Sequence, residues 1–290
     1  MATRTTPTSR LARTLVLLAL ALALVVGGGV ALVRYLQDRG LTGLVPSQQR
    51  CVATAGGQSV VLDLEQARLT SIIVGLSVRR GLAPRAASIA MATVYQETGI
   101  RNLDYGDRDS VGLFQQRPSQ GWGTKEQLMD PYYATGQFYD ALVAINGWEV
   151  GDITKVAQRI QRSGYPEAYR AHESDGRVLA SVLTGQTAGG FSCLDRSGTA
   201  GDPAGMAASL RQTFGRISSQ AEGRTVTVRV ASTALAWAYA SHAVANAASH
   251  GVVGVEAAGR AWRTDGQTLP GWTAAAGPTG SARTVTITLR

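Results

Sequence analysis

A continuous apolar segment near the N-terminus restricts this chain more than any other feature of its sequence. Residues 15–33 read LVLLALALALVVGGGVALV and contain no charged side chain. About 19 helical residues match the thickness of a bilayer's hydrocarbon core. Arginines at positions 4, 10 and 13 precede the segment, which favours a cytoplasmic N-terminus. We therefore expect residues 1–34 to form a cytoplasmic tail and a single transmembrane anchor, with a cleaved secretory signal as the alternative.

Such an anchor places the rest of the chain outside the cytoplasm, at the plasma membrane. In an oxidising compartment, the two cysteines, Cys51 and Cys193, can form a disulfide that closes a long loop. Two unrelated buried thiols are the alternative. The three histidines do not stand at ligand spacings from either cysteine, so we expect no metal site and no cofactor.

The basic character of the chain does not indicate a nucleic-acid partner. The formal net charge is +8, from 28 basic and 20 acidic residues. Most of the acidic residues lie in the middle of the chain, within residues 51–200, and the excess of arginine lies toward the two ends. No run of arginines is interleaved with aromatic residues, as a groove that follows a phosphate backbone would require.

Beyond the expected anchor, the sequence predicts an α+β protein of two domains. Helical spacing of apolar residues recurs over residues 64–78, 84–98, 131–145 and 153–161, and a strand–helix–strand pattern covers residues 225–289. Segments rich in small residues separate these parts. The expected divisions are a linker at 35–58, a mainly helical domain at 59–184, a linker at 185–204 and a small α+β accessory domain at 205–290.

Glu97 is the residue most suggestive of chemistry. It falls on the apolar stripe of the helix predicted over residues 84–98, in the last turn before Gly99. The negative end of the helix dipole and the loss of hydration both favour a protonated carboxyl group there, which is the form that a general acid needs. A solvated glutamate at a frayed helix end is the alternative.

The loop after this helix carries three acidic residues, Asp104, Asp107 and Asp109. Three interpretations remain open: a calcium site, a second catalytic carboxylate, or the capping of turns. An EF-hand that starts at Asp107 fails, because its twelfth position is Pro118 where a bidentate glutamate is required. Turn capping needs no further purpose, since aspartate commonly accepts hydrogen bonds from nearby backbone amides.

Two motifs then appear in order: YQETG at residues 95–99 and SVGLFQ at residues 110–115, followed by Asp130-Pro131. This pattern resembles the lysozyme-like soluble lytic transglycosylase superfamily. The similarity is greatest to the variant found in exported proteins of high-GC Gram-positive bacteria, which reads DYGDRDS and GLFQQR at this point. The resemblance covers residues 64–171 and implies a mainly α lysozyme-like domain that acts on peptidoglycan glycan strands.

The resemblance also implies roles for individual residues. Glu97 would be the catalytic acid, Gly112 would let the backbone approach the glycan, and Gln115 would bind an N-acetyl or hydroxyl group. Tyr105 and Trp122 are candidates for stacking on sugar faces.

One position departs from the superfamily's pattern. Where the pattern has AYNAG, this chain has RIQRSG at residues 159–164, so that Gln161 stands in place of a tyrosine that positions the sugar. Tyr165 or Tyr169 would have to supply that function, and we count Gln161 and Tyr165 among the candidate substrate-binding residues. The departure keeps open a catalytically inactive protein that binds glycan or assists envelope assembly.

Two reaction courses are compatible with this expectation. In the transglycosylase branch one glutamate suffices, because the sugar's own 6-hydroxyl closes an anhydro ring. A hydrolase needs a second carboxylate near the acid, for which Asp107 and Asp109 are the candidates. The motifs favour intramolecular transglycosylation.

Overall fold

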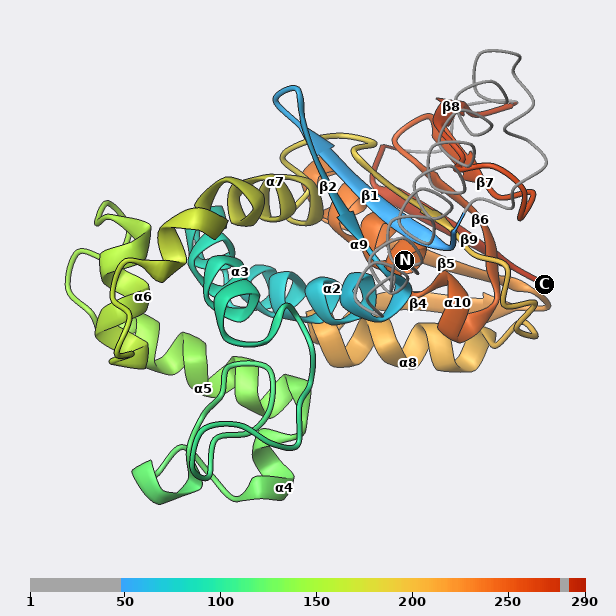
Figure 1. Ribbon diagram of the computed structural model, residues 1–290. Helices are drawn as coiled ribbons and strands as arrows, with labels where there is room; N and C mark the ends of the chain where they lie inside the picture. The colour runs from blue at the N-terminus through green and yellow to red at the C-terminus, as the bar shows by residue number, and fades with distance from the viewer. Residues whose placement is uncertain (1–47, 277–281) are drawn as a thin grey trace, which may run out of the picture. The chain divides into compact units, whose positions relative to one another are not determined.

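The computed structural model of this protein describes residues 48–276 and 282–290. The segment expected to cross the membrane, residues 15–33, lies outside these ranges. Within them, no helix is long and apolar enough to span a bilayer. Gln48–Arg290 form one compact unit of mixed α+β structure (Figure 1), as the sequence predicted for fold class.

A small antiparallel sheet joins the beginning of the described chain to its middle. Its strand order is β2-β1-β3, with β1 (Arg50–Ala55) paired to β2 (Gln58–Leu62) and to β3 (Phe191–Leu194). Cys51 lies opposite Cys193 in this pairing, and the two form a disulfide. The predicted disulfide is therefore confirmed.

This sheet also corrects the expected linkers. The segment 35–58 was predicted to be a linker, but it contains β1, and the segment 185–204 contains β3. Their small residues suggested flexible chain, whereas β1 and β3 pair with each other in an antiparallel sheet.

The helices predicted in the first half of the chain are confirmed. The central one, α3 (Pro84–Thr98), has proline at its first position and ends at Gly99, which adopts the left-handed φ of 61° that glycine readily allows. Residues on nearly all sides of α3 are buried. The other helical elements are α2 (Leu64–Arg79), η2 (Pro118–Gln120), α4 (Lys125–Leu128), α5 (Pro131–Val143), α6 (Ile153–Gln161), η3 (Ala168–His172) and α7 (Glu173–Leu183).

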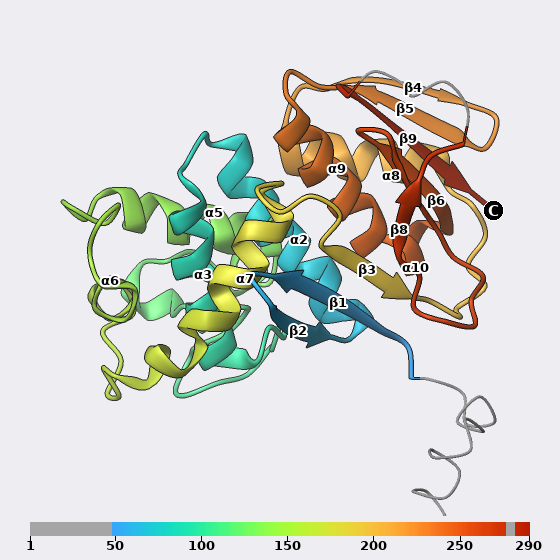
Figure 2. The ribbon, with the colours of Figure 1, turned by 90° about the horizontal axis from the view of Figure 1, so that it is seen from above.

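The C-terminal part contains a six-stranded antiparallel sheet with strand order β4-β5-β9-β6-β7-β8 (Figure 2). The predicted strands and the predicted Ala-rich helix are all present. In chain order the elements are α8 (Pro203–Phe214), β4 (Ser218–Glu222), β5 (Thr225–Arg229), α9 (Thr233–Ala245), α10 (Ala247–His250), β6 (Val252–Ala257), β7 (Arg260–Arg263), β8 (Trp272–Ala274) and β9 (Thr284–Leu289).

Helix α9 unites the two halves of the described chain. It is mostly apolar, and its residues from Ala236 to Ala245 are all buried, so it is covered on nearly all sides. It contacts β6 and β9 of the large sheet, and also β3, α2 and α7 of the first half. Residues 205–290 thus share one hydrophobic core with the preceding helices, in contrast to the separate accessory domain expected from the sequence.

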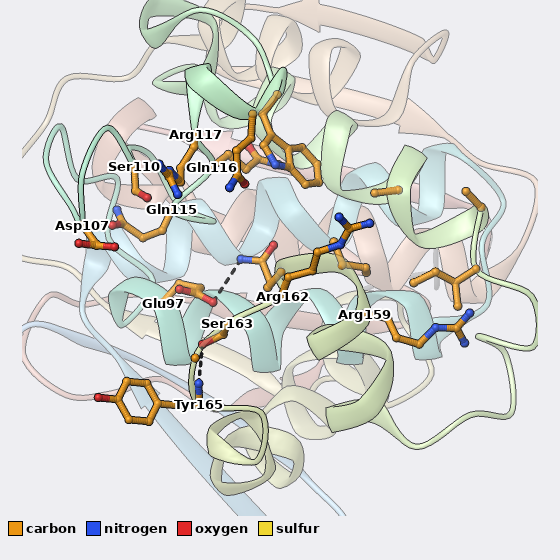
Figure 3. A pocket seen from close by; sticks show the side chains of 18 residues that line it. Glu97, Asp107, Ser110, Gln115, Gln116, Arg117, Arg159, Arg162, Ser163 and Tyr165 are labelled. Carbon is orange, nitrogen blue, oxygen red and sulfur yellow. Dashed lines mark hydrogen bonds between the residues drawn. The ribbon is translucent and has the colours of Figure 1, made fainter.

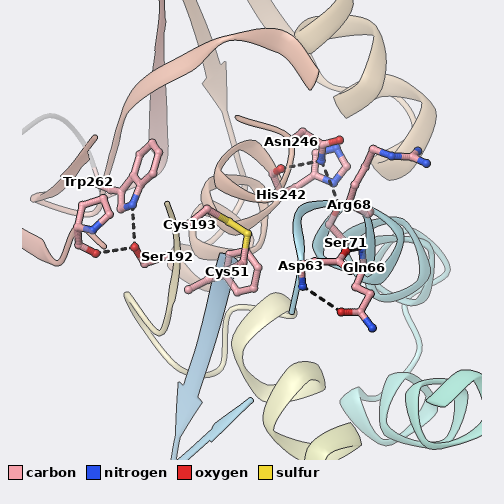
Figure 4. The surroundings of a disulfide bond; sticks show 12 residues. Cys51, Asp63, Gln66, Arg68, Ser71, Ser192, Cys193, His242, Asn246 and Trp262 are labelled. Atoms are coloured by element: carbon pink, nitrogen blue, oxygen red, sulfur yellow. Dashed lines mark hydrogen bonds between the residues drawn. A yellow bond between two sulfur atoms is a disulfide. The ribbon is translucent and has the colours of Figure 1, made fainter. Parts of the chain in front are cut away.

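A buried polar cluster lies within this contact (Figure 4). The Nδ2 atom of Asn246, at the end of α9, donates to the Oγ atom of Ser71 on α2 over 3.1 Å. His242 is buried on α9, and its Nε2 atom lies 2.9 Å from the Oγ atom of Ser209. The Nδ1 atom of His242 has no hydrogen-bond partner among the described residues. The cluster therefore has no carboxylate to stabilise a charged imidazole.

Acid is expected to destabilise the fold through His242. Burial lowers the pKa of His242 to about 3, whereas an unfolded histidine has a pKa of about 6.5. Between these values the unfolded chain binds one more proton, so the free energy of unfolding falls as the pH falls, by roughly 1.4 kcal/mol per pH unit. Denaturant unfolding between about pH 7 and about pH 4 measures this slope.

The variant His242→Gln removes the titrating group and should flatten the pH dependence. The half-buried His172 lies elsewhere, stacked on Tyr95, so His172→Gln serves as the control and should retain the wild-type slope. Equal slopes in the two variants would contradict this account.

Candidate active site

A cavity of about 1020 Å³ lies at the C-terminal end of α3 (Figure 3). Its walls come from the end of α3, the loop that follows it, α5, α6 and the segment after α6. The cavity thus brings together segments that are up to about 70 residues apart in the sequence. Of the residues expected to act on or bind a glycan, those that line it are Glu97, Asp107, Gln115, Trp122, Gln161 and Tyr165.

Glu97 stands half-buried in the cavity wall, in the last turn of α3. Two neutral donors converge on its Oε1 atom: the hydroxyl of Tyr169 at 2.7 Å and the Nε2 atom of Gln161 at 3.2 Å. The Nε2 atom of Gln161 also donates to the carbonyl oxygen of Phe114 over 2.8 Å, which fixes the amide. Among the described residues no donor reaches Oε2 of Glu97, so this oxygen is available to a ligand.

Tyr169 is a functional candidate that the sequence named only as an alternative. Its ring is fully buried in η3 and its hydroxyl reaches Glu97. Burial, reinforced by the bond to the Glu97 carboxylate, raises the pKa of Tyr169 far above its ordinary value. The phenol therefore keeps its proton at ordinary pH and remains a hydrogen-bond donor.

Tyr165 and Tyr169, the two candidates to replace the tyrosine missing at position 161, thus lie in different places. Tyr165 also lines the cavity, but its side chain is 78% exposed, and its backbone amide donates to the Oγ atom of Ser163. It stands at the rim as an exposed aromatic surface, whereas Tyr169 contacts the carboxylate from the protein interior.

Asp109 is held in a structural role. Its carboxylate accepts from the Nε atom of Arg117 at 2.9 Å, and from the backbone amide and hydroxyl of Ser119 at 2.7 and 3.0 Å. These bonds, with the Ser119 amide the strongest influence, hold the pKa of Asp109 well below its usual range. Its contacts match the turn-capping interpretation, and it is not among the described residues that line the cavity.

Asp107 differs from Asp109 in both respects. Its side chain is 90% exposed, its one ion pair is a 4.0 Å contact with Arg108, and it lines the cavity. Of the two candidate second carboxylates, Asp107 is therefore the one that faces the site.

The GLFQ segment forms a tight turn bracketed by an isolated bridge between Val111 and Gln116. Gly112 adopts a φ of 77°, and a Cβ atom there would collide with the carbonyl oxygen of Leu128. Its lack of a side chain lets the turn approach the end of α4, and the residue does not appear in the described lining of the cavity. Packing against α4 is thus a reason for glycine at this position, separate from the expected approach of its backbone to a glycan.

Gln115 does line the cavity, but its side chain also braces the loop. Its Nε2 atom donates to the carbonyl oxygens of Tyr105 and Gly112, at 3.2 and 3.3 Å. Gly106 leaves the room that its Oε1 atom occupies, because a Cβ atom at Gly106 would collide with it. Tyr105 contributes its carbonyl to this arrangement, while its ring is 67% exposed and outside the described cavity lining.

Sequence reasoning missed Gln116, the second glutamine of the motif. It is 2% exposed and lines the cavity, and its Nε2 atom donates to the carbonyl oxygen of Ala134 over 3.2 Å. Its Oε1 atom has no partner among the described residues. The doubled glutamine in GLFQQR was the available signal for a buried polar residue. A polar side chain that closely follows the buried Leu113 and Phe114 has little access to solvent and needs a partner inside the protein.

Metal binding receives no support in the described ranges, where no group of three or more His, Cys, Asp or Glu side chains is placed to hold an ion.

Comparison with protein-family models and with curated proteins finds no match to this chain. The site is therefore interpreted from its own residues and geometry.

Proposed function

We propose that this protein cleaves the glycan strands of peptidoglycan, with Glu97 as the proton donor. The observation that carries the proposal is the setting of Glu97: a carboxyl group at a helix end, inside a large cavity, with two neutral donors on one oxygen and the other oxygen open. A proton donor needs one carboxyl oxygen held in place and the other free to reach the substrate, and Glu97 has both.

The proposed reaction uses Glu97 twice. Protonated Glu97 gives its proton to the leaving glycosidic oxygen, and the resulting carboxylate then takes a proton from the attacking hydroxyl group. Gln161 and Tyr169 hold Oε1 in place and stabilise the carboxylate formed in the first step. Trp122 and Tyr165 would contact the sugar rings.

We favour attack by the sugar's own 6-hydroxyl, which yields an anhydro ring, over attack by water. The support is the state of the acidic loop, where Asp109 is bound to Arg117 and Ser119. Hydrolysis would then fall to Asp107 as the second carboxylate. At position 161 this chain has glutamine where the superfamily's pattern has tyrosine. Tyr169, eight residues later, supplies a phenol hydroxyl near Glu97 in its place.

The second candidate function is a non-catalytic protein that binds glycan or assists envelope assembly, which the replacement at Gln161 favours.

We further propose that the chain is anchored in the plasma membrane with its bulk outside the cytoplasm. The disulfide supports this location, because such bonds persist in oxidising compartments. Protection of the bulk from added protease in intact cells would contradict it.

Incubation of the full chain with purified cell wall separates the two functions. An enzyme releases soluble glycan fragments over time and lowers the turbidity of the suspension. A binding protein cosediments with the wall and releases nothing. Cosedimentation without release, in a correctly folded preparation, would replace the enzymatic proposal with the second candidate.

Tyr169→Phe should lower the turnover rate about 10-fold or more. Phenylalanine keeps the buried ring but removes the hydroxyl donor to Glu97, and a hydrogen bond to a charged group contributes roughly 1.5–3 kcal/mol. Tyr139→Phe is the matched control: it removes a buried hydroxyl that donates to the carbonyl oxygen of Ile73, outside the described cavity lining, and should leave the turnover rate nearly unchanged. Equal rates in the two variants, measured by fragment release, would show that Tyr169 does not position the acid.

A further inference from the structure

The cavity contains two arginines that the proposed reaction does not use. Arg159, in the last turn of α6, and Arg162, which follows that helix, both line the cavity. Neither guanidinium group has a hydrogen-bond or ion-pair partner among the described residues. The third arginine in the lining, Arg117, is paired with Asp109. The two free cations are therefore available to a ligand in the cavity.

The backbone at Arg162 provides a second, independent observation. Arg162 adopts φ 52° and ψ 40°, the left-handed conformation, at the C-terminal cap of α6. Helices usually end this way at glycine or asparagine, because other side chains are strained there. Both arginines complement the dipole at the C-terminal end of α6, and Arg162 in addition adopts a conformation in which glycine would be more stable. Strain of this kind occurs preferentially at functional sites.

Two local hydrogen bonds hold the backbone at Arg162. Its backbone amide donates to the carbonyl oxygen of Gln158 over 2.8 Å, and the Nε2 atom of Gln158 donates to the carbonyl oxygen of Ser163 at the same distance. The turn after α6 is thereby held against the helix. In Figure 3, Arg159 and Arg162 lie across the cavity from Asp107, with Glu97 between. The cavity thus has an acidic end and a basic end.

We propose that Arg159 and Arg162 bind a carboxylate carried by the glycan strand, so that the site selects acidic over neutral glycans. Guanidinium groups match carboxylates in geometry and charge. The inference rests on the proposed function, and it adds the substrate class. In peptidoglycan such a carboxylate has two sources: the stem peptide, or the lactyl ether of a strand from which the peptide has been removed.

Binding measurements with three defined probes test the inference. The probes are a neutral N-acetylglucosamine oligosaccharide, a glycan fragment that bears stem peptides, and the same fragment stripped of peptides by an amidase. Titrations use the full chain with Glu97→Gln as background, so that the probes stay intact. Arg159→Gln and Arg162→Gln should each weaken binding of the acidic probes by about tenfold and leave binding of the neutral probe unchanged.

Two further variants separate recognition from folding. Arg162→Gly removes the guanidinium group and the strain together, so it should weaken binding of the acidic probes while the melting temperature holds or rises. Arg224→Gln, at an exposed arginine in the turn between β4 and β5, is the matched control and should change neither quantity.

The outcomes are distinguishable. A loss confined to the peptide-bearing fragment assigns the carboxylate to the stem peptide, and a loss confined to the stripped fragment assigns it to the lactyl group. A loss with both fragments shows that the arginines accept either carboxylate. If all probes bind alike and the arginine variants change nothing, the inference is wrong and the proposed function stands. If no probe binds at all, both are wrong.

Discussion

Replacement of Glu97 by glutamine should reduce the release of glycan fragments by about 10²–10⁴-fold. The amide has the shape of the carboxyl group, so the packing at the end of α3 is preserved. It cannot give a proton to the leaving oxygen or take one from the attacking hydroxyl group. Binding of glycan should persist, because the rest of the cavity lining is unchanged. The measurement is the initial rate of fragment release from purified wall, with melting temperature recorded for each variant.

Glu149→Gln is the matched control for this substitution. Glu149 is an exposed glutamate between α5 and α6 that does not line the cavity. Its replacement should leave the rate unchanged. Full activity in Glu97→Gln would remove Glu97 from its proposed role, and the exposed Asp107 would then be the remaining carboxylate of the cavity.

Loss of the disulfide should produce the largest change in stability. Cys51 and Cys193 are 142 residues apart in the sequence, and a cross-link over such a loop removes much of the freedom of the unfolded chain. On the loop-entropy model this contributes about 5 kcal/mol to the free energy of unfolding. Both cysteines are buried, so the double variant Cys51→Ala, Cys193→Ala avoids burying new polar groups.

Denaturant unfolding of the oxidised wild type, the reduced wild type and the double variant measures this contribution. The reduced protein and the double variant should unfold at similar, much lower denaturant concentrations than the oxidised protein. An unchanged midpoint on reduction would mean that the pairing of β1 with β3 holds without the covalent bond.

The helices were predictable because the signals that define them are local. Pro84 and Gly99 mark the two ends of α3, and the stripe that carries Glu97 repeats within one helix. The strands β1 and β3 were both missed. β3 pairs only with β1, across a long separation in the sequence. β1 also forms a hairpin with β2 through Gly56 and Gly57, a local signal that was overlooked.

The site divides in the same way. Glu97 was singled out by its place on the stripe at the end of one helix, and Gln115 by the motif resemblance. The bond from Tyr169 to Glu97 joins residues 72 positions apart, and only the packing of η3 against α3 creates it. For Asp109 the sequence left turn capping and a catalytic role open, because no sequence pattern indicates its contacts with Arg117 and Ser119.

The two-domain expectation differed from the structure for a reason of burial. The small-residue segment around residues 185–204 has the composition of a linker. Composition does not indicate which elements pack against α9. Because nearly all sides of α9 are buried, it packs against α2 and α7 on one side and against β6 and β9 of the C-terminal sheet on the other. Domain boundaries inferred from composition are least secure where a later helix packs on both sides of the boundary, as α9 does.

We propose that this cavity cleaves glycan strands through Glu97, and mass spectrometry of the soluble products would detect that cleavage. Purified wall incubated with the full chain should release glycan fragments that carry an anhydro ring, each lighter by one water than the corresponding fragment with a reducing end. Glu97→Gln run in parallel should release none. Fragments with reducing ends alone would replace transglycosylation with hydrolysis, and the absence of any released glycan from the folded wild-type protein would contradict the claim itself.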